Sequence, residues 1–322
     1  MERSVLLHEE TRLVAELSRI RTKLNALTSI AVLPPEVLLQ IMTICAQRTH
    51  PCTRRGHRNV LAFSQVCRQW RILALQTSSL WSTIDLCNVA YASAYLTRSK
   101  DAPISLEAVS PLKAYNEPLE QHKRRIRSID AILFPDCMLA LFRSIDTADI
   151  IVLKNLTELN LRIPSIAAHV DLSCLQIPAV RRLTLEGVKV DWESCQGLMS
   201  LRLCGLVATH APTYRELLGM LGRSPLVEEI HLEDVVPGDA DYRCQSKIPL
   251  LHLNKVAVMS KQADCVPILQ EALLIPSTAQ VKLRSSGAAR WMTSSPGIFF
   301  SAHPASSPDA LHHHVYSTAI VF

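Results

Sequence analysis

Apolar residues recur at helical spacing through residues 1–31, in steps that alternate between four and three. This is the heptad spacing of a helix with one apolar seam. The seam consists of Leu6, Leu13, Leu17, Ile20, Leu24 and Leu27, with Glu10 in the slot between the first two. We predict an amphipathic helix here. Self-association through the seam and packing of the helix back on the next segment both fit the pattern, and the short stretch before Leu33 favours packing.

The next segment, residues 33–86, has helical spacing in two blocks. The block LPPEVLLQI begins with prolines, which suit the first turn of a helix, and continues with Val37, Leu38 and Ile41 on one predicted face. The block VCRQWRILALQTSSLWSTIDL repeats the spacing and ends near a second tryptophan, Trp81. A helical unit this short has more apolar side chains than it can bury alone. We therefore predict a small helical docking module.

After Leu86 the spacing changes to a recurring phrase, L-x-x-L-x-L, in which alternate residues face one side of a short strand. The clearest copies begin at Leu156, Val180, Leu198, Val227 and Leu253, with weaker ones at Ile126 and Ala279 and a leading strand at residues 103–107. Segments with helical spacing lie between them, at residues 138–147, 213–222 and 265–274. The clear copies start 18 to 29 residues apart, close to the roughly 20 to 29 residues of leucine-rich repeats.

The phrase resembles a leucine-rich repeat, except that Val188, Leu206 and Val235 replace the expected Asn or Cys. We predict an α + α/β fold, in which an N-terminal helix and a helical bundle precede an irregular leucine-rich-repeat solenoid of short parallel strands with helices or loops. A two-layer α/β domain with coincidental matches is the alternative. The predicted parts are residues 1–31 (helix), 32–88 (helical module), 89–284 (repeat-like domain) and 285–322 (poorly ordered Ser- and Pro-rich tail).

The motifs of the helical module resemble those of the F-box. LPxE before an apolar helix, C-x-x-W-R and a terminal LW occur together and in order, and residues 62–86 closely resemble F-box proteins of mushroom-forming fungi. The resemblance implies a bundle that binds the Skp-type adaptor, and through it the cullin, of a ubiquitin ligase. It implies adaptor contacts at Leu33, Pro34, Val37, Leu38, Ile41, Cys67 and Trp70. An insert at residues 47–59 departs from the family pattern and leaves the middle helix boundaries open.

Composition narrows the class of protein. The chain has 322 residues, 48% of them apolar, which suffices for a large core. Glycine is scarce at 9 residues, and no glycine-rich phosphate-binding motif occurs. The first residues carry acids where a signal peptide needs bases, and no long uncharged apolar stretch follows. We expect a cytoplasmic or nuclear protein without a membrane partner, whose 10 cysteines are reduced thiols.

The net charge of +5 is concentrated in the first 100 residues. Between Glu36 and Asp85 there are six arginines, from Arg48 to Arg71, and no acid. A nucleic-acid site would need aromatic residues interleaved regularly with these arginines, whereas only Phe63 and Trp70 lie among them. A solvated surface is the simpler interpretation, and nucleic-acid binding is the least favoured function.

Candidate chemistry is sparse. Cys45, His50, Cys52 and His57 do not have the spacing of a zinc finger, and the chain contains no C-x-x-C pair. No cysteine or serine lies in a known nucleophile motif. We therefore predict no metal site, no cofactor and no catalysis, and regard the histidine tract at residues 312–314 as incidental.

Polar residues between the strand anchors are candidates for contacts with a protein substrate. If the strands stack in register, they share a concave face with Arg182 and Arg202 at its centre. The candidates are Glu158, Arg182, Arg202, Glu229 and His231. Ordinary solvated sheet residues are the alternative.

Together these patterns predict a non-catalytic substrate-receptor subunit of a Skp-cullin-F-box ubiquitin ligase. A protein-interaction scaffold that uses the F-box and the N-terminal helix outside a ligase is the second interpretation, and a basic nucleic-acid binder is the third.

Overall fold

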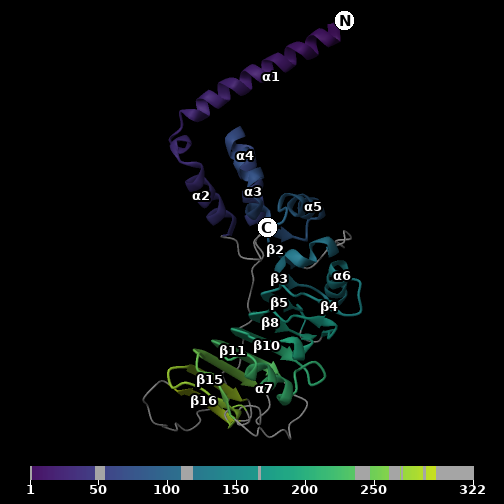
Figure 1. Cartoon of the computed structure of the whole chain (residues 1–322), viewed down its shortest axis with the longest axis vertical. Coiled ribbons are helices and arrows are strands. Elements are labelled where there is room, and N and C mark those ends of the chain that lie inside the picture. Colours follow the sequence, from purple (N-terminus) through teal and green to yellow (C-terminus); the bar gives the residue numbers. More distant parts are fainter. Residues whose placement is uncertain are drawn as a thin grey trace, which may run out of the picture.

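The computed structural model describes residues 2–47, 55–109, 119–165, 168–235, 247–260, 269, 271–285 and 288–294. Within them the chain combines helices and strands, with the helices leading. Figure 1 shows a long first helix, a group of helices after it, and then a row of strands that follows the order of the chain. This agrees with the predicted order of a helical part and an α/β part.

The front of the chain is helical. Its elements are α1 (Glu2–Ala26), the 3-10 turn η1 (Ser29–Val32), α2 (Pro35–Gln47), α3 (Arg55–Val66), α4 (Arg68–Gln76) and the 3-10 turn η2 (Ser78–Trp81). Helices α2, α3 and α4 pack on one another. The buried side chains between them are Leu38, Met42, Val60, Ala74 and Leu80. Together α2, α3, α4 and η2 form what we call the front bundle.

Helix α1 forms where the sequence predicts it, but it packs differently. None of its residues is buried, and Figure 1 shows it running away from the rest of the chain. Only its last turn, at Thr22, Asn25 and Ala26, comes near the front bundle. The expected packing of this helix back on the bundle is therefore corrected, because η1 turns the chain between α1 and α2 and directs the apolar seam into solvent.

The rest of the chain is organised around one sheet of ten strands. In spatial order these are β1 (Thr83–Asp85), β2 (Ile104–Val109), β3 (Ile126–Ile132), β5 (Glu158–Arg162), β8 (Arg182–Glu186), β10 (Ser200–Leu206), β11 (Glu229–Val235), β13 (Lys255–Ser260), β15 (Gln280–Ser285) and β16 (Ala288–Ser294). Neighbours from β1 to β15 pair in parallel, and β16 returns antiparallel. Each predicted strand phrase is confirmed as a strand of this sheet.

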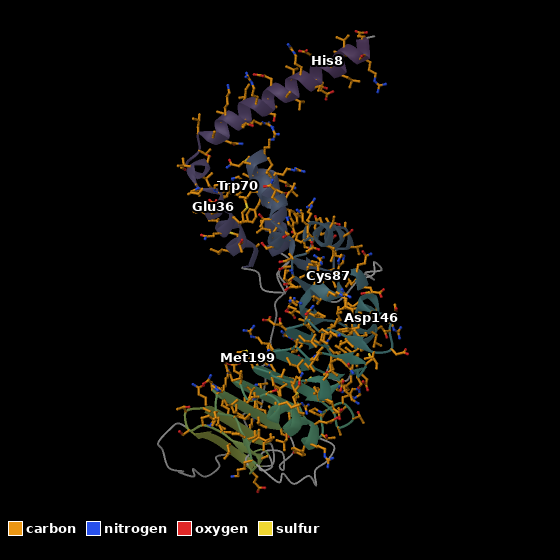
Figure 2. All side chains as sticks on the ribbon, in the orientation of Figure 1. His8, Glu36, Trp70, Cys87, Asp146 and Met199 are labelled. Carbon is orange, nitrogen blue, oxygen red and sulfur yellow. The ribbon has the colours of Figure 1, made fainter. Side chains whose placement is uncertain are left out.

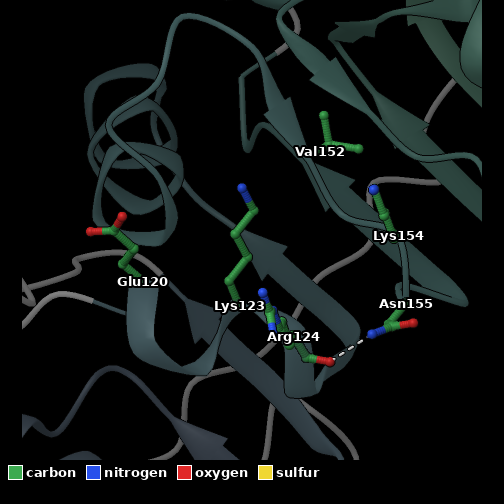
Figure 3. A pocket seen from close by; sticks show the side chains of 6 residues that line it. All are labelled: Glu120, Lys123, Arg124, Val152, Lys154 and Asn155. Atoms are coloured by element: carbon green, nitrogen blue, oxygen red, sulfur yellow. Dashed lines mark hydrogen bonds between the residues drawn. The ribbon is translucent and has the colours of Figure 1, made fainter.

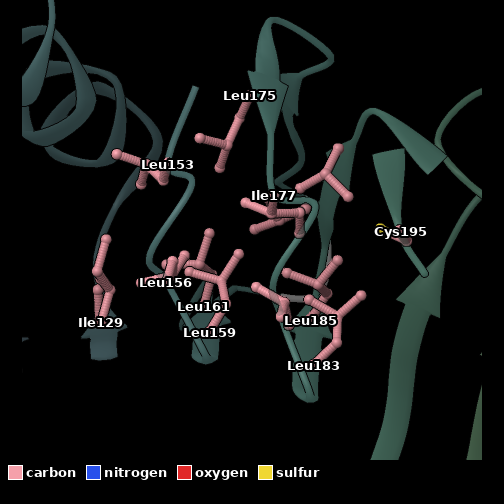
Figure 4. Close-up of a cluster of buried hydrophobic side chains, with 14 of the residues drawn as sticks. Ile129, Leu153, Leu156, Leu159, Leu161, Leu175, Ile177, Leu183, Leu185 and Cys195 are labelled. Carbon is pink, nitrogen blue, oxygen red and sulfur yellow. The ribbon is translucent and has the colours of Figure 1, made fainter. Parts of the chain in front are cut away.

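The register across the sheet follows the sequence phrase. Leu159, Leu183 and Leu201 are paired neighbours, as are Leu161, Leu185 and Leu203 two residues further on. All six are buried. Figure 4 shows Leu159, Leu161, Leu183 and Leu185 projecting to the same side, toward Leu175 and Ile177. One face of the sheet is thus a stack of apolar rows, as alternation in a strand requires.

The apolar face is covered by the connections between strands. They contain α5 (Val89–Arg98), η3 (Glu120–Arg125), α6 (Pro135–Ile145), η4 (Trp192–Ser194) and α7 (Tyr214–Gly222), and the short strands β4 (Ile151–Val152), β6 (Val170–Leu172), β7 (Leu175–Gln176), β9 (Val188–Val190), β12 (Ile248–Pro249) and β14 (Leu273–Leu274). Figure 1 shows α5 and α6 on the same side of the sheet. The opposite side, which we call the open face, carries the polar residues of each phrase.

Three neighbouring strands turn at the same level. Gly187 after β8, Gly205 in β10 and Asp234 in β11 all have positive φ, of 68°, 57° and 50°. In a regular strand, residues two apart point to the same side of the sheet. The left-handed residue breaks this rule, so Leu206 and Val235 are buried although Cys204 and Glu233, two positions earlier, point to the open face. Gly205 suits this corner because glycine adopts positive φ without steric cost.

The boundaries differ from the prediction at two places. β16 lies within the segment predicted as a tail, so the sheet continues beyond residue 284, because a hairpin partner for β15 follows it directly. Residues 295–322 of the predicted tail lie outside the described residues. The predicted helices at 138–147 and 213–222 match α6 and α7 closely. Half of the one at 265–274 lies outside the described residues, and its last two residues form β14 rather than a helix, because they pair with β12.

Candidate functional site

The first candidate surface lies on α2. Leu38 is 2% exposed and Met42 is fully enclosed, so this face of the helix packs into the front bundle. The neighbouring face carries Val37, Ile41 and Ile44, which are 39%, 39% and 49% exposed. Residues four and three apart lie along one stripe of a helix, so these three side chains form a continuous apolar strip facing solvent.

The other predicted contact residues lie before α2 and at the start of α4. Pro34 is exposed and Leu33 is half-buried at the start of α2. Trp70 is half-buried on α4, where its ring lies 6.2 Å from that of Phe63 at 56°. Cys67 is half-buried at the residue before α4. Figure 2 shows Trp70 and Glu36 on facing elements of the front bundle, while His8 lies far out on α1.

A shallow groove borders this surface. Its volume is about 230 Å³, and it is lined by the last turn of α1, by η1 and by the junction of α3 and α4, including Val66, Cys67 and Trp70. Val66 is exposed, as is Ile72 on α4. The apolar area open to solvent is therefore larger than α2 alone provides, which is typical of a protein-binding surface.

The seven predicted adaptor residues differ in their exposure to solvent. Pro34, Val37 and Ile41 lie on the surface, and Leu33, Cys67 and Trp70 are partly accessible. Leu38 is corrected from a solvent-facing contact to a core residue, 2% exposed, which reaches the surface only where it lines the groove. The sequence reasoning missed Ile44, although its spacing of seven from Val37 could have identified it.

Trp81 holds the end of the bundle in place. Its ring is fully buried, and its Nε1 donates a hydrogen bond to the backbone oxygen of Ala74 at 2.7 Å. Buried indole N–H groups need such a partner. The terminal tryptophan of the motif is thus a structural residue rather than a contact residue.

The second candidate surface is the open face of the sheet. Glu158, Arg182, Ser200 and Glu229 stand in one register row, and Arg202 and His231 stand together in the next. The structure therefore brings the five predicted substrate residues onto neighbouring rows of one face. Their use by a substrate remains a prediction.

The charges on this face are arranged differently from the sequence expectation. Arg182 forms an ion pair with Glu158, and their side chains are 66% and 46% exposed. The pair cancels its own charge, so Arg202 is the main cation at the centre. Toward β1 the row of Arg202 continues with Asp130, Glu107 and Asp85. The sequence phrases did not reveal this acidic end, because β1 and β2 lack a full phrase.

A third feature is a cavity of about 590 Å³ beside η3, which Figure 3 shows. Lys123, Arg124 and Lys154 are among its lining residues. Lys123 forms an ion pair with Asp146, and this hydrogen bond lowers the pKa of the Asp146 carboxyl. Asn155 donates its side-chain N–H to the backbone oxygen of Arg124 at 2.8 Å. The Lys123–Asp146 ion pair and the hydrogen bond from Asn155 link η3 to two other connections between strands.

Cys195 is the one buried thiol among the described cysteines. Burial raises the pKa of the Cys195 thiol to about 12, so it stays protonated at neutral pH. Of the zinc-type quartet in the sequence, only Cys45 has a described side chain. His50 and Cys52 lie outside the described residues.

Comparison with known families assigns the front bundle. A family model described as F-box-like matches residues 30–87. The front of this chain is an F-box-like domain. No curated protein and no solved structure matches the chain.

F-box domains act in protein–protein interaction and typically bind Skp-type adaptors, and proteins that contain them are generally non-catalytic. Among the described helices, none has the length and apolar character needed to cross a membrane.

Proposed function

We propose that this chain is the substrate-receptor subunit of a Skp-cullin-F-box ubiquitin ligase. The observation that supports this most is the apolar strip of Val37, Ile41 and Ile44 on the F-box-like domain. An exposed strip of this kind is stabilised when a partner covers it. A Skp-type adaptor is the partner that F-box domains typically bind, and the adaptor in turn would recruit the cullin.

We also propose that residues 89–284 are an irregular leucine-rich-repeat solenoid that holds the target. Parallel strands in chain order and a polar open face support this, because stacked repeats present such a face for binding. Glu158, Arg182, Arg202, Glu229 and His231 are the contacts we assign to a protein substrate. The motifs in residues 62–86 support an F-box of the kind found in mushroom-forming fungi. A role in a ubiquitin ligase supports a location in the cytoplasm or nucleus.

The mechanism would be proximity. The F-box end is anchored on the ligase, the open face holds the target, and other subunits transfer ubiquitin to a lysine kept at high local concentration. No residue of this chain makes or breaks a bond in that scheme, and no cofactor takes part.

The test is copurification of the tagged full chain from cells treated with a proteasome inhibitor. A receptor brings down a Skp-type adaptor, a cullin and a ubiquitin-conjugated target. A scaffold outside the ligase brings down the adaptor without the cullin. Failure to capture any adaptor, with the chain folded by circular dichroism, would exclude the receptor role.

A second interaction is favoured by α1. Five of the six seam residues lie on this helix and Leu27 directly follows it; all six are exposed, and the helix buries nothing. Helices in proteins gain most of their stability from packing of an apolar face. We infer that two copies pair through the seam as a parallel coiled coil. In that arrangement Glu16 and Arg21 occupy the flanking positions that meet across the two helices, where opposite charges attract.

A further inference from the structure

Three metal-ligating side chains of different types meet on the open face. Cys204 lies on β10, and His231 and Glu233 lie on the adjacent strand β11. Cys204 and Glu233 are direct register partners, and His231 precedes Glu233 by two residues, so all three side chains leave the sheet on the same side. The sequence separates the first from the other two by almost thirty residues, and only the pairing of β10 with β11 brings them together.

The strands hold these side chains at the corner described above. Gly205 and Asp234 have left-handed backbones directly after Cys204 and Glu233. Leu206 and Val235 are buried immediately beyond. The thiol and the carboxylate are therefore the last outward groups before the two strands turn, and buried residues on each side fix their direction.

The three ligand atoms are close together. The Nε2 atom of His231 lies 3.2 Å from Oε2 of Glu233, and the Sγ atom of Cys204 lies 3.9 Å from the same oxygen. All three atoms lie within 4.8 Å of one another, and each residue is half-buried.

These separations fit the edges of a tetrahedron around zinc. Zinc binds His nitrogen and carboxylate oxygen at about 2.0–2.1 Å and thiolate sulfur at about 2.3 Å, which gives N to O edges of about 3.3 Å and S to O edges of about 3.5 Å. The observed N to O distance already matches. The S to O distance must shorten by a few tenths of an ångström, and the S to N distance, which lies within 4.8 Å, must close to about 3.6 Å; rotation of the side chains supplies such movements.

We propose that Cys204, His231 and Glu233 form a binding site for a divalent ion of the zinc class, with the fourth position open toward the open face. A thiolate and a carboxylate balance the charge of such an ion, and this mixed set of sulfur, nitrogen and oxygen donors suits zinc or cobalt better than magnesium or calcium. The guanidinium of Arg202 lies near Cys204, where its charge favours the thiolate, and it would stabilise the bound thiolate from the outer shell. The site does not depend on adaptor binding.

The test is titration of the purified full chain, freed of metal with a chelator, with Co²⁺ as the probe. A bound thiolate gives a sulfur-to-cobalt charge-transfer band in the near ultraviolet, together with visible bands of a tetrahedral ion. The Cys204→Ser variant should lose the charge-transfer band. His231→Gln and Glu233→Gln should each weaken cobalt binding by at least the roughly 10- to 100-fold that loss of an outer-shell partner costs.

Matched controls separate this site from other thiols and histidines of the chain. Cys174→Ser removes a half-buried thiol elsewhere on the fold, Cys52→Ser removes one from the quartet of the insert, and a variant with alanine at residues 312–314 removes the histidine tract. All three should keep the band. A band that persists in Cys204→Ser, or a wild-type chain that gives no band, would overturn the proposal. Circular dichroism of each variant shows whether the sheet is intact.

Discussion

The indole ring of Trp81 meets the phenol ring of Tyr95 edge-on, with ring centroids 4.9 Å apart and ring planes at 74°. Trp81 closes η2 of the F-box-like domain, and Tyr95 lies on α5 of the sheet domain. The guanidinium of Arg98 lies 4.4 Å over the indole, and both rings are buried. The two parts of the chain therefore share one core here, which fixes the open face relative to the adaptor side.

Truncation of this contact should destabilise both parts together. Trp81→Ala is expected to lower the free energy of unfolding by about 3–5 kcal/mol, because it removes a large buried ring and leaves a cavity. Trp81→Phe keeps an aromatic contact with Tyr95 but leaves the Ala74 oxygen without its donor, at a cost of about 1–3 kcal/mol. Urea denaturation followed by far-ultraviolet circular dichroism measures both. A Trp81→Ala protein as stable as the wild type would contradict the shared core.

The apolar strip should bind the adaptor without contributing to the fold. Val37→Asp combined with Ile41→Asp should lower adaptor capture by about tenfold or more, since two charges would enter an apolar interface. The unfolding free energy should change much less than for a core substitution, because each residue is 39% exposed rather than enclosed. Capture by a purified Skp-type adaptor is the measurement, and Ile150→Asp, at a site 55% exposed in the sheet domain, is the matched control.

Leu38→Ala is the complementary variant. It should cost about 2–5 kcal/mol of stability as a core truncation, while capture by the protein that remains folded stays normal. A fully folded Leu38→Ala protein that no longer captures the adaptor would show that Leu38 contacts the adaptor directly.

Charge reversal on the open face tests the target-binding role. Arg182→Glu with Arg202→Glu should weaken target capture by about tenfold and leave adaptor capture unchanged. The exposed pair of Arg182 with Glu158 contributes less than about 1 kcal/mol, so the fold should survive its loss. Reversal of Arg143 and Arg215, which lie exposed on α6 and α7, is the matched control. Equal target capture by both double variants would discard the open face as the binding surface.

Pairing through α1 should depend on the seam alone. Leu17→Asp places a charge in the seam and should convert a dimer into a monomer in analytical ultracentrifugation. Ser18→Asp adds the same charge on the outer side of the helix and should leave the dimer intact. A wild-type chain that sediments as a monomer across the accessible concentration range would exclude the pairing.

The ion pair of Lys123 with Asp146 should make stability depend on acid pH. The hydrogen bond from Lys123 lowers the pKa of Asp146 in the folded chain. The unfolded chain therefore binds the proton first, and the stabilisation is complete above the ordinary carboxyl pKa of about 4 and is lost as the pH falls through the folded value. Asp146→Asn should be less stable at neutral pH and should lose less stability on acidification. Urea midpoints at several pH values measure this, and identical acid slopes would contradict the role of the pair.

Local periodicity in the sequence was sufficient to predict eight of the ten strands of the main sheet, all but β1 and β16. The strands begin where L-x-x-L-x-L places two leucines on one side, as at Leu159 and Leu161, because alternation in a strand is a property of a few neighbouring residues. Helix α7 follows the same logic. Its capping box of Thr213 and Glu216 lies in the sequence beside the apolar residues that the helix buries.

The sequence by itself determined the main strands of the sheet and the helices α1, α2, α6 and α7, and it identified the F-box-like motif. Only the tertiary structure decided that Leu38 is buried while Val37 is exposed. The two residues lie on adjacent faces of α2, and the positions of α3 and α4 determine which of these faces is covered. It also decided that Arg182 meets Glu158, and that Cys204 meets His231 and Glu233. Such contacts depend on which strands become neighbours and in what register, and that is fixed by burial of the whole apolar face rather than by the residues that come into contact.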